Sequence, residues 1–305
     1  MKVILKLIFA FIFIMFSCSY GDSANNSGIF NNNFSNEDTI SKPSNISYAW
    51  IPKSGYSNKQ SIVNQIPVPK GYKRVLTKSG SFEEWLRFLP LNPENSKVLL
   101  FDGREKPYQS GAFRVINIDI GSSDLQQCAD ATMRLKAEYH YSRGEFDKIH
   151  FNFTSGHKVS FDDWRKGKKP SISGNNVSFS SANGQTDNSY TNFKKYLKMV
   201  FSYAGTASLE KELVHADLTQ IKAGDLFIKG GFPGHAVIVL DVAENIENGD
   251  KIFLLAQSYM PAQSIHILKN FDHNQKLSPW YPINFGEMLH TPEWDFKAGS
   301  LKKWK

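Results

Sequence analysis

Four short apolar runs follow one another in the last third of the chain, and they constrain the fold more than any other feature. Their ranges are 225–229, 235–242, 251–258 and 264–268. Each run has the length and composition of a strand, and Glu247-Asn248-Gly249-Asp250 supplies a turn between the second and the third. Strands joined by short turns pair as antiparallel neighbours, so the sequence predicts an antiparallel β-meander.

Helices and further strands precede this meander. Ser81-Phe82-Glu83-Glu84 is a capping-box pattern, and Gly121-Ser122-Ser123-Asp124 predicts the start of a longer helix with apolar residues at helical spacing. The predicted helices are 83–89, 124–142, 190–204 (with Gly205 as its C-cap) and 208–214, and the predicted strands are 97–102, 113–120 and 149–154. This order predicts an α+β domain in which residues 143–215 form an insertion, with a polar surface excursion at 155–188.

The first residues have the pattern of a bacterial export signal. Lys2 and Lys6 form a short basic segment before an apolar run at 7–16, and this run is too short to span a membrane as a helix. The segment that ends at Cys18 is similar to a bacterial lipobox, which implies that Cys18 carries a lipid. An ordinary cleaved signal and an uncleaved anchor are the alternatives.

These patterns predict the organisation of the whole chain. We expect a signal peptide at 1–17, a lipidated flexible tether at 18–46 that is rich in Ser, Asn and Gly, and a single α+β domain at 47–305. Ser19 follows the cysteine and favours the outer membrane over the inner one. The expected location is therefore the bacterial cell envelope, with a membrane as one partner through the lipid anchor.

Composition limits the remaining partners. A hydrophobic content of 41% and an aromatic content of 13% suit a packed globular body, and the formal charge is +7. A charge of this size favours association with anionic envelope polymers. It is too scattered to predict nucleic-acid binding, and an exported protein does not meet nucleic acid.

Three residues point to nucleophilic catalysis. Cys128 lies near the start of a predicted helix, His235 opens an apolar strand after a Gly-rich loop, and Gln257 ends the next strand. A helix N-terminus and an imidazole both lower the pKa of a thiol, and a polar third residue orients the imidazole. Gln126 or Gln127, or the backbone N–H of Cys128, is a candidate oxyanion donor.

Each of these residues also has a structural interpretation. Cys128 lies on the apolar stripe of its predicted helix, where a buried inert thiol is common. His235 can simply end a loop, and Gln257 can simply satisfy a buried backbone group. A helix that begins at residue 124 would place Cys128 in the second turn, where the helix dipole has faded.

Two stretches carry a resemblance to known families. AGDLFIKGGFPGHAVIVLD (223–241) and the strand FLLAQS that follows resemble the C-terminal half of the papain-like amidases of the NlpC and CHAP kind, which cut amide bonds in peptidoglycan stems. The resemblance implies a papain-like core with Cys128 as nucleophile, His235 as base and Gln257 as orienting residue. Asp225 would then be a turn residue.

The whole chain resembles a group of uncharacterised lipoproteins of Bacteroidota, a domain-of-unknown-function family, through its CADA, GGFPGHAV and AQSYMPAQ stretches. The expected function is that of a cysteine amidase or peptidase acting on peptidoglycan or another envelope peptide. A non-catalytic envelope lipoprotein that binds glycan or a partner on the same fold is the alternative. Tyr259 is a candidate substrate-cleft residue, and Trp294 is one of several aromatic residues that can contact a glycan. No metal or cofactor motif occurs, so neither is expected.

Overall fold

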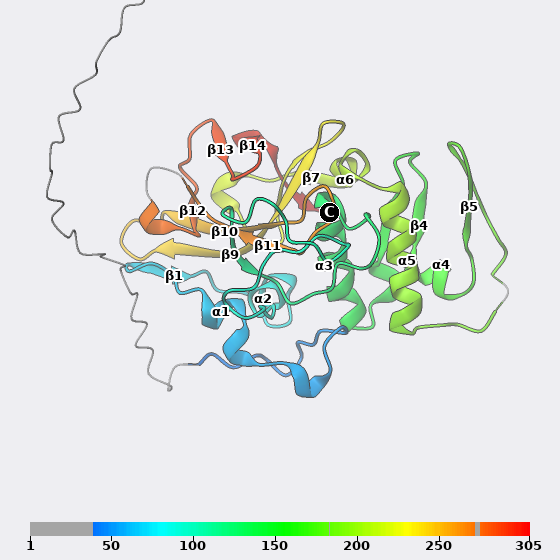
Figure 1. Cartoon of the computed structure of the whole chain (residues 1–305), viewed down its shortest axis with the longest axis horizontal. Coiled ribbons are helices and arrows are strands. Elements are labelled where there is room, and N and C mark those ends of the chain that lie inside the picture. The colour runs from blue at the N-terminus through cyan, green and yellow to red at the C-terminus, as the bar shows by residue number, and fades with distance from the viewer. Residues whose placement is uncertain (1–38, 183, 272–274) are drawn as a thin grey trace, which may run out of the picture. The chain divides into compact units, whose positions relative to one another are not determined.

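The computed structural model describes residues 39–182, 184–271 and 275–305 of the chain (Figure 1). The α-helices are α1 (Ile62–Gln65), α2 (Phe82–Arg87), α3 (Cys128–Ser142), α4 (Phe161–Arg165), α5 (Tyr190–Tyr203) and α6 (Thr206–Glu212). The strands are β1 (Tyr72–Arg74), β2 (Ala112–Val115), β3 (His150–Asn152), β4 (Lys158–Ser160), β5 (Pro170–Ser173), β6 (Asn176–Phe179), β7 (Leu213–His215), β8 (Leu226–Lys229), β9 (His235–Asn245), β10 (Lys251–Gln257), β11 (His266–Leu268), β12 (Tyr281–Pro282), β13 (Met288–His290), β14 (Asp295–Lys297) and β15 (Leu301–Trp304).

One large sheet organises the domain. Its main order is β2-β11-β10-β9-β8-β15-β7, with β1 paired to β9 and β12 paired to β10. Every pairing described for this sheet is antiparallel, and β8 to β11 form the predicted meander. The final strand, β15, lies between β8 and β7, so the sheet is completed by the last segment of the chain.

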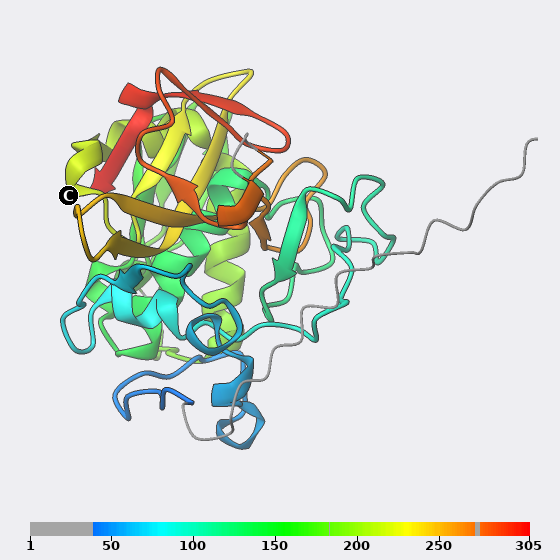
Figure 2. The same ribbon diagram turned by 90° about the vertical axis from the view of Figure 1, so that its left-hand side faces the viewer.

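Both faces of the central strands are covered. Along β9, Ile238 and Leu240 pack in one cluster with Trp85 of α2, while Val237 and Val239 pack in another with residues of the C-terminal segments. This alternation is the two-residue period of a strand. Figure 2 shows the blue and cyan N-terminal segments on one side of the gold and yellow strands and the orange and red segments on the other. A sheet covered in this way holds the residues at its strand ends firmly in place.

The domain begins earlier than the sequence predicted. Ile40 exchanges hydrogen bonds of 2.9 and 2.8 Å between its backbone N–H and C=O groups and the Asn64 side chain, and Ile46 is buried in the core. The boundary at residue 47 was therefore too late, because a few apolar residues inside a polar stretch dock on the domain. Residues 1–38, which include the predicted signal peptide, Cys18 and most of the predicted tether, lie outside the described residues.

The insertion at 143–215 carries its own apolar cluster. It contains the β3–β4 and β5–β6 hairpins with α4, α5 and α6, and Figure 1 shows α4, α5, β4 and β5 gathered at one end, with α3 between them and the sheet. Phe161 and Trp164 of α4 pack with Phe193 of α5 and with Met133 of α3. The segment 155–188 was predicted as a surface excursion, and it nevertheless contributes these buried aromatic side chains to the insertion.

Several predicted boundaries were wrong. Residues 97–102 form no continuous strand. Leu99 and Leu100 make only isolated β-bridges, and the chain then turns, because Gly103 adopts a φ of +85° and its N–H donates to the Leu100 carbonyl at 3.0 Å. The strand predicted at 113–120 is shorter, as β2, and Gly205 caps the start of α6 rather than the end of α5. Among the described residues, no helix has the length and apolar character needed to cross a membrane.

Candidate active site

A cavity of about 370 Å³ opens where α3, β9 and the end of α5 meet. It is lined by Gln127, Cys128, Ala129, Asp130, Phe201, Ala204, Gly205, Thr206, Gly231, Phe232, Pro233, Gly234, His235, Tyr259, Met260 and Trp294. Cys128, His235 and Tyr259, which the sequence singled out, thus share one cavity. The end of the insertion supplies four of the lining residues, from Phe201 to Thr206.

Cys128 is the first residue of α3. The helix starts four residues later than predicted, because the Asp124 carboxylate accepts a hydrogen bond from the Ala262 N–H at 2.6 Å and holds the 122–127 segment in an irregular loop. Gln127 is the N-cap residue, and its N–H donates to the Asp130 carboxylate at 3.0 Å. The thiol therefore lies in the first helical turn, where N–H groups have no partner within the helix.

The environment of the thiol favours its neutral form. Burial raises the pKa of Cys128 to about 11, and the negative charge of Asp130 acts in the same direction. The backbone N–H groups of Ala236, Ala129 and Cys128 itself oppose this effect, because they stabilise a thiolate. Cys128 is 8% exposed, and the resting side chain is a protonated thiol that already faces three donors.

His235 is positioned by the glycine before it. A side-chain atom at Gly234 would approach the Gly231 carbonyl to 2.4 Å and the Thr206 hydroxyl to 2.5 Å, so only glycine fits there. The same hydroxyl donates to the Gly231 carbonyl at 3.1 Å, which ties the loop to the first residue of α6. The close contacts at Gly234 thus fix the start of β9, although Phe232 in the same loop is exposed.

A chain of hydrogen bonds runs from His235 away from the cavity. Its Nε2 lies 2.8 Å from Oε1 of Gln257, and Nε2 of Gln257 donates to Glu293 at 2.6 Å. The Glu293 carboxylate in turn forms an ion pair of 2.5 Å with Lys106. Because a carboxylate only accepts, the Gln257 amide must present its nitrogen to Glu293 and its oxygen to His235.

This order of donors assigns the tautomer of the imidazole. The oxygen of Gln257 only accepts, so Nε2 of His235 carries the proton and Nδ1 keeps a free lone pair. Burial lowers the pKa of His235 to about 4; the Gln257 hydrogen bond opposes this shift and the charge of Lys106 adds to it. The ring is therefore neutral at physiological pH, with Nδ1 available as a base.

Aromatic rings enclose the imidazole. The centroid of the His235 ring lies 4.8 Å from that of Tyr259, 5.4 Å from that of Trp294 and 5.8 Å from that of Phe296. The described residues include no hydrogen bond between the Cys128 thiol and the imidazole, although both line the cavity. Catalytic contacts in unliganded sites are often long and shorten when substrate binds.

The two predicted amide donors have different surroundings. The Gln126 side chain accepts from Arg134 at 2.5 Å and lines a separate groove, away from Cys128. Gln127 does line the cavity, but its amide donates to Asp124 at 3.1 Å. The structure thus leaves the helix N–H groups as the donors closest to the thiol. Asp225 accepts from the Lys222 N–H at 2.9 Å, which is a turn contact.

Sequence reasoning missed Glu293 and Lys106. Both lie in segments without a clear period, and they reach Gln257 only through tertiary packing. Trp294, one of several aromatic residues considered for glycan contact, lines the cavity and lies next to Glu293 in the β13–β14 hairpin. Within residues 39–182, 184–271 and 275–305, no group of three or more His, Cys, Asp or Glu side chains could hold a metal ion.

Comparison with known proteins places the chain in a family without adding an activity. No curated protein matches the chain, and no solved structure matches its fold. One family model, described as "Domain of unknown function (4846)", matches residues 62–303, which include every residue of the cavity and of the hydrogen-bond chain described above. The protein is therefore a member of this domain-of-unknown-function family.

Proposed function

We propose that this protein is a papain-like cysteine amidase or peptidase that cuts amide bonds in peptides of the bacterial cell wall. The observation that carries the proposal is the oriented histidine. Nε2 of His235 is committed to Gln257, and Nδ1 is left as a base in the cavity that also contains Cys128 at the start of a helix. A nucleophile, a base and an orienting residue in one cavity are the parts that acyl transfer requires.

The residues support a general-base mechanism. Nδ1 of His235 takes the thiol proton as the sulfur of Cys128 attacks the carbonyl carbon, and a C–S bond forms. The resulting imidazolium gives this proton to the leaving amine as the C–N bond breaks, which leaves a thioester on Cys128. A water molecule, deprotonated by the same nitrogen, then hydrolyses the thioester and restores the thiol.

The N-terminus of α3 supplies electrostatic stabilisation of the charge that develops in the proposed reaction. The N–H groups of Cys128 and Ala129 favour negative charge near the sulfur, and the first N–H groups of a helix have no intrahelical partner. In the proposed reaction they receive the oxyanion. A single donor of this kind is worth about 10²–10³ in kcat.

The walls of the cavity suit the positioning of a peptide. Phe201 and Thr206 line it from the insertion, and the rings of Tyr259 and Trp294 lie against the imidazole. Aromatic walls of this kind also suit a peptide attached to a sugar. The insertion is proposed to act as a wall that selects substrate.

We further propose that the protein is a lipoprotein of the outer membrane, anchored through Cys18, as in the Bacteroidota lipoproteins that it resembles. Mass spectrometry of the mature N-terminus tests this directly. The expected terminus is a diacylated or triacylated Cys18, and a free terminus at any other residue would contradict the anchor.

Hydrolysis of defined muropeptides tests the enzyme. The mature chain should release a new amine and a new carboxylate from a stem peptide, as followed by liquid chromatography and mass spectrometry. The variants Cys128→Ser and His235→Gln should lose this activity and keep their circular dichroism spectrum, whereas Ser142→Ala at the far end of α3 should keep both. Absence of turnover by the native chain on cross-linked and uncross-linked peptides would reject the proposal.

A non-catalytic binding protein is the second candidate, and the burial of Cys128 favours it. A thiol that is 8% exposed with a pKa near 11 is typical of an inert core residue. The distinguishing measurement is labelling by a peptidyl acyloxymethyl ketone, which must first bind in the cavity. His235-dependent labelling of Cys128 supports the enzyme, and equal slow labelling of the native chain and His235→Gln supports the binding protein.

A further inference from the structure

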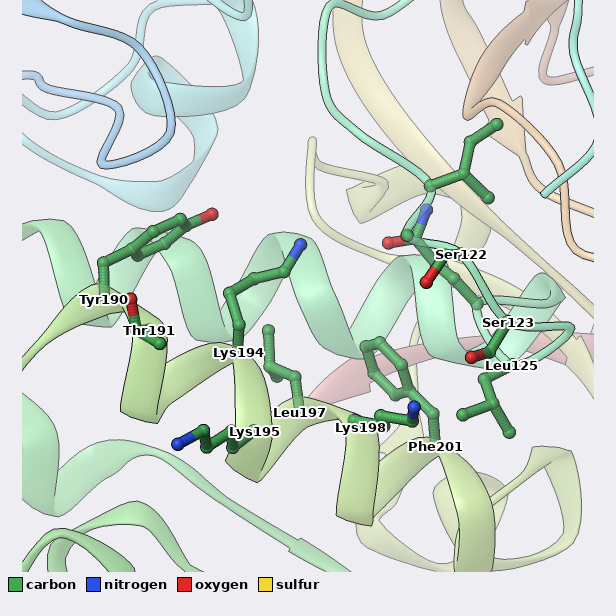
Figure 3. A pocket seen from close by; sticks show the side chains of 13 residues that line it. Ser122, Ser123, Leu125, Tyr190, Thr191, Lys194, Lys195, Leu197, Lys198 and Phe201 are labelled. Carbon is green, nitrogen blue, oxygen red and sulfur yellow. The ribbon is translucent and has the colours of Figure 1, made fainter. Parts of the chain in front are cut away.

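A second groove, of about 390 Å³, lies between the 120–126 loop and α5. Figure 3 shows Phe201 of α5 beside Leu125 of the loop, with Leu197 and Lys194 further along the same helix. The groove thus has an apolar floor formed by Leu125, Leu197 and Phe201. It has the size of a site for one or two amino-acid residues.

The nitrogen of a buried side-chain amide in the wall of this groove has no hydrogen-bond acceptor among the described residues. Gln126 is 1% exposed, and its Oε1 accepts from Arg134 at 2.5 Å. Because a guanidinium only donates, this contact fixes which end of the amide is oxygen. The Nε2 of Gln126 is left as a donor without an acceptor among the described residues. A buried donor without an acceptor is unfavourable, and an acceptor atom of a bound ligand would supply the missing hydrogen bond.

The charge of the groove is positive. Its thirteen lining residues include Lys194, Lys195 and Lys198 and no acidic residue. Two carboxylates lie close to lining residues: Asp119 is 2.6 Å from Lys194 and is also paired with Arg134 at 2.6 Å, and Glu138 accepts from the Tyr190 hydroxyl at 2.7 Å. Lys195 and Lys198 are exposed on α5 and add positive charge to the groove next to the Gln126 donor.

The groove and the Cys128 cavity are neighbours. Phe201 lines both, and the loop that forms one wall of the groove continues through Gln127 directly into Cys128. A peptide whose scissile carbonyl lies at Cys128 would therefore extend into the groove within one or two residues.

We propose that the groove is a subsite for a carboxylate-bearing residue of the substrate peptide. One carboxylate oxygen accepts from the Gln126 amide and the charge is balanced by Lys198 and Lys194, while the aliphatic part of the residue packs on Leu197 and Phe201. The position of the scissile bond in this assignment rests on the proposed function. The binding of an acidic peptide in the groove is independent of the proposed function.

Calorimetry with a matched pair of peptides tests the subsite. The mature chain carrying Cys128→Ala, which cannot turn over substrate, is titrated with a stem tetrapeptide and with the same peptide after conversion of its carboxylates to carboxamides. The carboxylate form should bind at least about tenfold more tightly, because charge-assisted hydrogen bonds are the stronger ones. Lys198→Gln should weaken only the carboxylate form, by about fivefold.

Two further variants sharpen the result. Gln126→Glu keeps the oxygen that Arg134 requires and replaces the free donor by an acceptor, so it should abolish the preference for the carboxylate. Lys78→Gln removes the same charge as Lys198→Gln from an exposed loop residue outside the groove, and it should change neither affinity. If Gln126→Glu fails to fold, the comparison of Lys198→Gln with Lys78→Gln still decides the matter.

Equal affinities for the two peptides, or binding of both weaker than about 1 mM, would overturn the subsite. Failure of the proposed function gives a different pattern. Carboxylate-selective binding by a protein whose Cys128 never reacts with a peptidyl electrophile would keep the subsite and reject the hydrolase. Turnover without discrimination between carboxylate and carboxamide would keep the hydrolase and reject the subsite.

Discussion

Glu293 accepts a hydrogen bond of 2.6 Å from the Gln257 amide, and this contact determines which nitrogen of His235 carries a proton. Gln257 has no charge of its own to select a tautomer. The carboxylate selects the orientation of the amide, and the amide selects the proton position. Lys106 holds the carboxylate in place through an ion pair of 2.5 Å.

Exchange of the Gln257 amide and the Glu293 carboxylate provides the sharpest test of the hydrogen-bond chain. Gln257→Glu places two carboxylates 2.6 Å apart, so we expect a loss of about 10² in kcat. Adding Glu293→Gln to that variant restores one donor and one acceptor in the opposite order and should recover most of the rate. Steady-state kinetics on a muropeptide measures both.

The matched control is Glu287→Gln, an exposed glutamate just before the β13 strand that should leave kcat unchanged. A merely structural role for Glu293 would lower the thermal stability of both single variants without recovery of kcat in the double variant. That outcome would contradict the assigned tautomer.

Cys128 should react slowly with small electrophiles in the resting protein. Because burial holds its pKa at about 11, the thiolate fraction rises about tenfold for each pH unit between 7 and 9. The rate of iodoacetamide labelling, followed by intact mass, should rise in the same proportion. The sequence analysis expected a helix N-terminus and an imidazole to lower this pKa, whereas burial raises it. A rate that is already at its plateau at pH 6 would restore that expectation.

Acid should weaken the contribution of buried histidines to stability. Burial lowers the pKa of His235 and of His140 to about 4 and that of His266 to about 3. Between pH 6.5 and 4 these side chains bind more protons in the unfolded chain than in the folded one, so their contribution to the free energy of unfolding falls as the pH falls. Burial raises the pKa of Asp225 to about 6, and this carboxyl acts in the opposite direction below that pH. Each such histidine contributes about 1.4 kcal/mol per pH unit at most.

Urea denaturation at pH 7.5, 6 and 5 measures this slope. His266→Gln removes one buried histidine without touching the cavity, so the free energy of unfolding of this variant should lose less between pH 7.5 and 5 than that of the native chain. The same change with pH in both proteins would show that the His266 side chain is solvated.

Asp241 is the main buried charge on β9. It is fully buried and accepts from Arg74 at 2.7 Å and from Arg87 at 2.9 Å. Asp241→Asn should cost about 3–5 kcal/mol of stability, because two largely buried guanidinium groups lose their counter-charge. The exposed pair of Asp102 and Arg104 is the matched control, and Asp102→Asn should leave the stability nearly unchanged, because water screens an exposed ion pair. Similar losses for both variants would contradict this interpretation.

Local patterns predicted the four strands of the meander well, but they did not predict β7 or the strands from β12 to β15. The strands at 225–229, 235–242, 251–258 and 264–268 correspond to β8, β9, β10 and β11, because each is bounded by turn residues and is long enough to show its character. The same local reasoning failed at 97–102, where Gly103 turns an apolar run back on itself. Apolar content alone does not distinguish a strand from a buried turn.

The site was predictable only in part. His235 and Gln257 lie on adjacent strands, so strand order is enough to bring them together. The start of α3 depends on a hydrogen bond from Ala262, which is more than a hundred residues from the helix, and no local pattern records it. Lys106 precedes Cys128 in the chain, and Glu293 follows Gln257. Only the folded structure shows that both reach the site.

The position of β15 has a consequence for biogenesis. Because residues 301–304 insert between β8 and β7, the sheet has a gap until these residues have emerged from the ribosome. The long sequence separation between β15 and its neighbours makes early, N-terminal-first folding unfavourable. A nascent chain that stops before residue 301 already carries the thiol of Cys128 and still lacks a continuous sheet.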